Sequence, residues 1–160
     1  MPINDNGDIA RAVGYVAIYG AYIEDRVAEL IDMVKEIIRL RENINFLSAS
    51  DQAKHLHKAL KSAFSNAPDY SRKNDDIEQT NKILADVEGH LKNRHVVIHS
   101  TLISKPGGDI IIRKNRRTNT EEEVSSKEII DLANDLFELQ SEINALQFPV
   151  QRLISALPKS

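Results

Sequence analysis

The chain of 160 residues contains no cysteine, which excludes a disulfide framework and any metal site built on thiolates. It has only six glycines and five prolines, and it has no long apolar run of the kind that forms a buried strand. This scarcity of turn-forming residues favours helices. The length is typical of one domain with its own hydrophobic core, so we expect a single domain over residues 1–160.

Signals for export or membrane insertion are also missing. The N-terminal segment lacks the basic region and following apolar core of a secretory signal. The fairly apolar stretch from Ala12 to Ile23 is followed by three charged residues, so it is too short to cross a membrane. Together with the lack of cysteine, this predicts a cytoplasmic protein that does not associate with membranes.

The charge balance gives no global field that would attract nucleic acid. Lysine and arginine number 21 against 24 acidic residues, a net charge of −3, so any binding to nucleic acid requires a local basic patch. The sequence has no glycine-rich phosphate loop, serine nucleophile elbow or kinase signature. Asp86 and His90 have i, i+4 spacing, but the Glu-x-x-His pair of di-iron bundles is missing, so we expect neither a metal nor a cofactor.

The first helix is predicted from three columns of apolar residues spaced by seven. It begins near Asp8, which is suited to capping, and ends near Arg41. Adjacent columns form one wide buried face. The columns are Val13, Gly20, Val27, Val34; Val16, Ile23, Leu30, Ile37; and Ala17, Glu24, Ile31, Ile38. Glu24 is a carboxylate in an otherwise apolar column, and a buried carboxylate needs a partner.

Two further helices are predicted in the centre of the chain. The shorter one begins at Ser50 or Asp51 and leads into a loop over residues 66–73. His55 and His57, two positions apart on this helix, face different directions and are expected at the surface rather than as a metal pair. The longer helix is capped near Asn74, and its apolar stripe alternates spacings of three and four: Ile77, Thr80, Leu84, Val87, Leu91, Arg94 and Ile98.

The periodicity changes after Ser100. Residues 101–103 and 109–113 are predicted as two short strands around a glycine turn, followed by a polar loop that ends at Glu123. Ser125 and Glu128 fit a capping box that starts a fourth helix, and Pro149 stops or kinks this helix before a last short one. The predicted fold is all-α: a four-helix, up-and-down type bundle with a small β-hairpin inserted between helices 3 and 4 and a short C-terminal helix.

Arg94 occupies a position of the third apolar stripe where an apolar residue is due. An unpaired buried guanidinium is costly, so it must find an anion or lie at an interface. Glu24 interrupts the apolar face of the first helix in the same way. We therefore expect Glu24 to be the partner that orients Arg94.

The segment Asn93-Arg94-His95-Val96-Val97-Ile98-His99-Ser100 places an arginine and a histidine at the end of this helix with four residues between them. It resembles the R-x4–6-H motif of the HEPN superfamily, small all-helical proteins that include metal-independent ribonucleases of toxin, antiphage and RNA-processing systems. The resemblance covers this one segment and its place in a helical chain. It implies an endoribonuclease that acts on RNA as a homodimer, with toxin or antiphage defence as the candidate role.

On a straight helix, five positions correspond to about 500°, so Arg94 and His99 would point about 140° apart. Either the helix loosens near Ser100, or a second copy of the motif completes the site. The family resemblance implies the second arrangement, in which two protomers line one shared cleft.

The resemblance assigns the catalytic roles to His99 and Arg94. His99 would take the proton of a ribose 2′-hydroxyl, and Arg94 would stabilise the charge that develops on the phosphate. Family members commonly place a polar residue, often asparagine, after the arginine; here His95 follows it and Asn93 precedes it. His95 is thus either a second acid or base or a polar wall of the cleft, and Ser100 either contacts phosphate or only ends the helix.

A basic segment follows the motif and is the candidate surface for the RNA backbone, with a solvated loop as the alternative. It contains Lys105, Arg113, Lys114, Arg116 and Arg117.

A non-catalytic helical interaction or scaffold protein of the same fold is the competing prediction. In that case Arg94 would pair with an acid and His99 would cap carbonyl groups at the helix end. HEPN toxins are often paired with a nucleotidyltransferase-like antitoxin, so such a protein is a further candidate partner.

Overall fold

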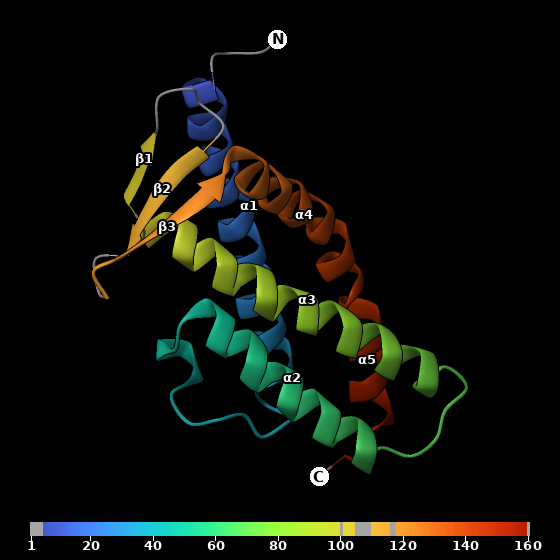
Figure 1. The fold of residues 1–160 in the computed structure, drawn as a ribbon. Coiled ribbons are helices and arrows are strands. Elements are labelled where there is room, and N and C mark those ends of the chain that lie inside the picture. The colour runs from blue at the N-terminus through green and yellow to red at the C-terminus, as the bar shows by residue number, and fades with distance from the viewer. Residues whose placement is uncertain (1–4, 100, 105–109, 116–117, 160) are drawn as a thin grey trace.

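The structure is a computed structural model that describes residues 5–99, 101–104, 110–115 and 118–159. It confirms the predicted class, a helical bundle with a small β insertion and a short C-terminal helix (Figure 1). The elements in chain order are α1 (Asp5–Val34), the short 3-10 helix η1 (Ile44–Phe46), α2 (Ala49–Asn66), α3 (Lys73–His99), β1 (Thr101–Ser104), β2 (Ile110–Asn115), β3 (Thr120–Ser125), α4 (Ser126–Ala145) and α5 (Gln147–Ala156).

The helices do not alternate strictly in direction. α2 and α4 both run antiparallel to α3, but α1 and α4 run the same way (Figure 1). Tyr19 of α1 contacts Phe137 of α4, and Tyr22 of α1 forms a hydrogen bond with Asn144 of α4. Later residues of α1 thus contact later residues of α4, which shows that the two helices are parallel. The connection over residues 35–48 explains the difference from a simple up-and-down order, because it carries the chain back along the bundle before α2 begins.

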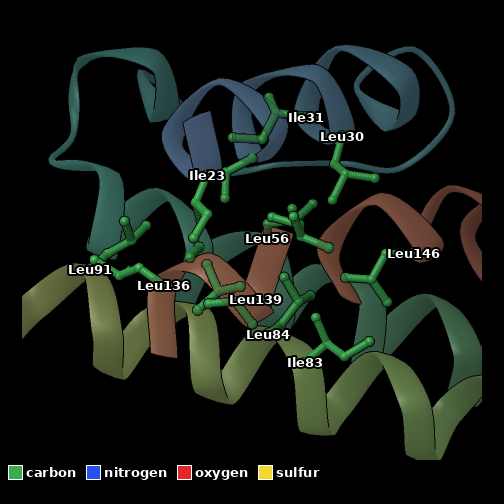
Figure 2. Close-up of a cluster of buried hydrophobic side chains, with 14 of the residues drawn as sticks. Ile23, Leu30, Ile31, Leu56, Ile83, Leu84, Leu91, Leu136, Leu139 and Leu146 are labelled. Atoms are coloured by element: carbon green, nitrogen blue, oxygen red, sulfur yellow. The ribbon is translucent and has the colours of Figure 1, made fainter. Parts of the chain in front are cut away.

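The core lies where α1, α2, α3 and α4 meet, and it is made mostly of aliphatic side chains together with Phe64 (Figure 2). Its largest fully buried members include Ile23, Leu56, Leu84 and Leu136, one from each of these helices. Burial of a side chain of this size stabilises the fold by about 1.5–3 kcal/mol. Ile23 and Leu84 belong to the apolar stripes that the sequence shows in the first and third long helices, and these stripes therefore identify the inward faces of α1 and α3.

Several element boundaries differ from the sequence prediction. α1 ends at Val34 rather than near Arg41, because the chain turns there and Ile38 enters the core from outside the helix. α2 begins at Ala49 rather than at Ser50 or Asp51, because Ser48 caps it: its hydroxyl accepts a hydrogen bond from the Asp51 amide. α3 begins at Lys73, one residue before the predicted cap. The Ser125 cap of α4 is confirmed, since its hydroxyl accepts from the Glu128 amide.

The β insertion is a three-stranded antiparallel sheet in the order β1-β2-β3. β1 and β2 correspond to the predicted hairpin, whereas β3 lies in a segment that the sequence predicted as a polar loop. The register places Arg113 opposite Glu122 and Lys114 opposite Glu121. Cross-strand pairing of opposite charges stabilises an exposed strand, so the acidic run here is a strand and not a loop.

The described helices include none that is both long enough and apolar enough to span a membrane.

Candidate functional site

α3 continues without interruption through both motif residues and ends at His99. The helix therefore keeps Arg94 and His99 on different sides, about 140° apart. Loosening of the helix before His99 does not occur, so one chain does not bring the two side chains together in this way. Arg94 is half-buried against α1, whereas His99 is exposed on the last turn.

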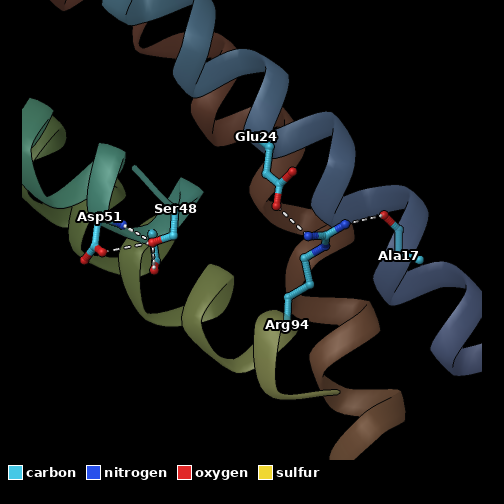
Figure 3. A network of polar contacts seen from close by, with 6 residues as sticks. Ala17, Glu24, Ser48, Asp51 and Arg94 are labelled. Carbon is cyan, nitrogen blue, oxygen red and sulfur yellow. Dashed lines mark hydrogen bonds and ion pairs between the residues drawn. The ribbon is translucent and has the colours of Figure 1, made fainter. Parts of the chain in front are cut away.

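Arg94 is held by two groups of α1 that lie about two turns apart (Figure 3). Its Nη1 donates to Glu24 Oε1 at 2.5 Å, and its Nη2 donates to the Ala17 carbonyl oxygen at 3.4 Å. The predicted pairing of Glu24 with Arg94 is thus present. The arginine side chain is 18% exposed and the glutamate side chain 34%, so the pair lies at the rim of the bundle and not in its centre.

Gly20 makes room for the arginine. A Cβ atom added at this glycine would fall on Cδ and Nε of Arg94, closer than any real contact. Nε is fully buried at this position and has no hydrogen-bond partner among the described residues. The sequence shows Gly20 inside an apolar column of α1, but only the packing reveals that the missing side chain receives the arginine.

His95 and His99 lie one turn apart, and both are exposed. Their ring centroids are 4.3 Å apart and the planes are tilted by 43°. Residues at i and i+4 share one face of a helix, so the spacing in the sequence is sufficient to predict this contact. The motif thus presents two adjacent imidazoles to solvent.

Asn93 lies on a different side of α3 from the two histidines. With His90 and Val97 it lines a cavity of about 350 Å³ between α3, α4 and the sheet. The remaining lining residues are Arg113, Val124, Glu128, Ile129, Asp131, Leu132 and Asp135. Asn93 lies two positions before His95, about 200° away around the helix, so it does not share the histidine face.

The predicted basic surface is described only in part. Arg113 is paired with Glu122 on the neighbouring strand, so its charge is already compensated. Lys114 is half-buried. Lys105, Arg116, Arg117 and the predicted supporting residue Ser100 lie outside the described residues.

The two histidines of α2 are half-buried rather than fully at the surface, and each contacts a polar neighbour. His55 Nε2 lies 2.7 Å from Arg41 Nη1, and His57 Nε2 lies 2.9 Å from Asn81 Oδ1. Across the described residues, no cluster of three or more histidine, aspartate or glutamate side chains is arranged to hold a metal ion.

A second ion pair, which the sequence did not reveal, joins α3 to α5. Asp76 is completely buried and accepts hydrogen bonds from Arg152 Nε at 2.8 Å, from Arg152 Nη2 at 2.7 Å and from the Tyr70 hydroxyl at 3.0 Å. Hydrogen bonding from Arg152 holds the pKa of Asp76 below its usual value. Burial, together with the bond to Asp76, raises the pKa of Tyr70 to about 12. In the sequence, Asp76 is marked only as one of two acidic residues in the first turn of α3, where a carboxylate is favourable.

Comparison with known proteins found no protein-family model, curated protein or solved structure that matches this chain.

Proposed function

We propose that this chain is a metal-independent endoribonuclease of the HEPN type, in which two copies of the motif form one cleft. The observation that supports this proposal best is the pair of exposed imidazoles near the end of α3: His95 directly follows the arginine that Glu24 holds in place, and His99 lies one turn further on. Histidine accepts and releases protons near neutral pH, and a fixed guanidinium can stabilise phosphate charge.

The reaction requires one proton acceptor and one stabilising cation. His99 takes the proton from the ribose 2′-hydroxyl, and the freed oxygen attacks the adjacent phosphorus. The bond from phosphorus to the 5′-oxygen breaks, and that oxygen takes up a proton from solvent and leaves as a 5′-hydroxyl. Arg94 stabilises the extra negative charge on the phosphate oxygens during the attack. The products carry a 2′,3′-cyclic phosphate and a 5′-hydroxyl, and DNA is not a substrate because it lacks the 2′-hydroxyl.

A second copy of the chain is part of this proposal. Arg94 and His99 diverge on one straight helix, so His99 of one protomer and Arg94 of its partner would act on the same phosphate. Arg94 would have to present its exposed edge to the cleft while it stays bound to Glu24, which is compatible with five donors in a planar fork.

A non-catalytic interaction protein is the second candidate, and a specific contact favours it. Two donors of Arg94 are used by Glu24 and Ala17 within the same chain, which is what a purely structural arginine would do. In this alternative the bundle is a docking scaffold that cleaves no RNA, so replacement of His99 has no effect on RNA cleavage.

The decisive experiment compares wild type with His99→Ala on mixed RNA and on single-stranded DNA, in excess chelator. We expect wild type alone to cut RNA, to leave cyclic phosphate ends and to spare DNA. His99 is exposed on the last turn, so the variant should remain folded, and circular dichroism checks this. Cleavage that is equal in both proteins would refute the role of His99. A folded, dimeric wild type that cuts no RNA would favour the scaffold.

A further inference from the structure

The two exposed histidines of α3 also have the geometry of a metal chelate. His95 and His99 are separated by three residues on one helix, a spacing that places two imidazole nitrogens on the same face. The contact between their rings shows that both side chains already turn toward one another in the folded chain. We propose that His95 and His99 form a binding site for a divalent transition-metal ion of the class that prefers imidazole, such as Zn²⁺ or Ni²⁺.

The distance between the rings agrees with this proposal. Metal-to-nitrogen bonds of about 2.0–2.1 Å in tetrahedral geometry place two ligating imidazole centroids about 5 Å apart. The observed centroid distance is 4.3 Å, so the rings need to open by only about 1 Å, which side-chain rotation of two exposed residues provides.

The site has an open coordination sphere. Since no set of three potential ligands is found among the described residues, water molecules complete the coordination. This distinguishes it from a structural zinc site, which is closed by four protein ligands. Binding is therefore reversible and follows the order of metal affinities for imidazole, and folding of the chain does not depend on it.

Metal binding at this position has a consequence for catalysis that rests on the proposed function. A ligating nitrogen donates its lone pair to the metal and can no longer accept a proton from the ribose hydroxyl. Bound Zn²⁺ would therefore inhibit a ribonuclease that uses His99 as a base, and a chelator would restore its activity. The ion acts as an inhibitor of the site and takes no part in the reaction.

The binding test needs no RNA, so it is independent of the proposed function. Tag-free wild type is titrated calorimetrically with ZnCl₂ and with NiCl₂ in a buffer that does not chelate metals. The two test variants are His95→Ala and His99→Ala, and His90→Ala on the same helix is the matched control. All four proteins are checked for helicity by circular dichroism.

We expect wild type and His90→Ala to bind one ion per chain with the same affinity. Each of the other two variants should bind at least tenfold more weakly, because one imidazole provides no chelate. Equal affinity in all four proteins, or no binding by wild type, would overturn the proposal. If the ion binds as expected but wild type has no ribonuclease activity, the metal site stands and the proposed function fails.

Discussion

Arg94 of α3 donates to Glu24 of α1 across a sequence separation of 70 residues, with 2.5 Å between Nη1 and Oε1. Each residue interrupts the apolar stripe of its own helix, and the two interruptions face one another in the fold. The pair links the two helices at the rim of the bundle, where the glutamate remains 34% exposed. Two predictions follow from this contact, and two more concern the buried Asp76 and the proposed shared cleft.

Glu24→Gln tests the ion pair itself. The amide oxygen can still accept a hydrogen bond, but the half-buried guanidinium loses its counter-charge, so we expect a loss of about 1–3 kcal/mol in the free energy of unfolding. Urea denaturation measures this loss. Asp32→Asn on the same helix is the control: it removes the exposed pair of Asp32 and Lys35, which solvent screens, so its loss should change stability little. If Glu24→Gln changes neither stability nor RNA cleavage, Glu24 has no role in the site.

Gly20→Ala tests the space that receives Arg94. An alanine in a helix normally stabilises it by about 0.5–1 kcal/mol relative to glycine. At Gly20 the added methyl group would collide with the Arg94 side chain, so we expect a loss of about 1–3 kcal/mol instead. Gly14→Ala is the matched control in the same helix, because a Cβ there meets nothing within 4 Å. Stabilisation by both substitutions in thermal denaturation would show that Arg94 does not need this space.

Asp76 makes stability depend on pH in the acidic range. Its pKa is lowered in the folded protein, so the unfolded chain takes up a proton first as the pH falls. The contribution of Asp76 is present above the unfolded value of about 3.9 and disappears as the pH falls through the lower folded value. We expect Asp76→Asn to lower the free energy of unfolding at neutral pH by about 2–3 kcal/mol, less than for a fully enclosed pair because the Arg152 side chain is 33% exposed.

Denaturation at a series of pH values from neutral to acidic measures this contribution. The difference between wild type and Asp76→Asn should shrink as the pH falls below about 4. Asp75→Asn replaces an exposed neighbour on the same turn and should keep the wild-type pH dependence. A constant difference between wild type and Asp76→Asn at all pH values would contradict a lowered pKa.

The shared cleft can be tested by mixing inactive variants. Arg94→Ala and His99→Ala should each abolish cleavage as homodimers. A dimer with one copy of each variant contains one intact combination of Arg94 and His99 if the two residues act across the interface. Random exchange of subunits should then restore about a quarter of the wild-type activity.

RNA cleavage before and after subunit exchange measures this recovery, and a mixture kept below the exchange temperature is its control. No recovery, despite mixed dimers detected by native mass spectrometry, would argue that each site lies within one chain. In that case, dimerisation would not account for the 140° that separates Arg94 from His99 on the helix.

The sequence alone determined the helical class, the inward face of each helix and the two polar interruptions of those faces. Local periodicity is sufficient for this, because every buried helix must turn its apolar residues inward. It also determined the Ser125 cap, which depends on residues three positions apart. The contact between His95 and His99 was implicit in their spacing for the same reason.

Only the tertiary structure decided which polar groups meet. The buried contact of Asp76 with Arg152 joins positions 76 residues apart, and no local pattern marks it. The role of Gly20 depends on Arg94 of α3 packing against it. The formation of β3 depends on pairing with the basic strand β2. The parallel course of α1 and α4 likewise depends on the path of residues 35–48. These features depend on long-range packing, which fixes side-chain partners only once the whole core has formed.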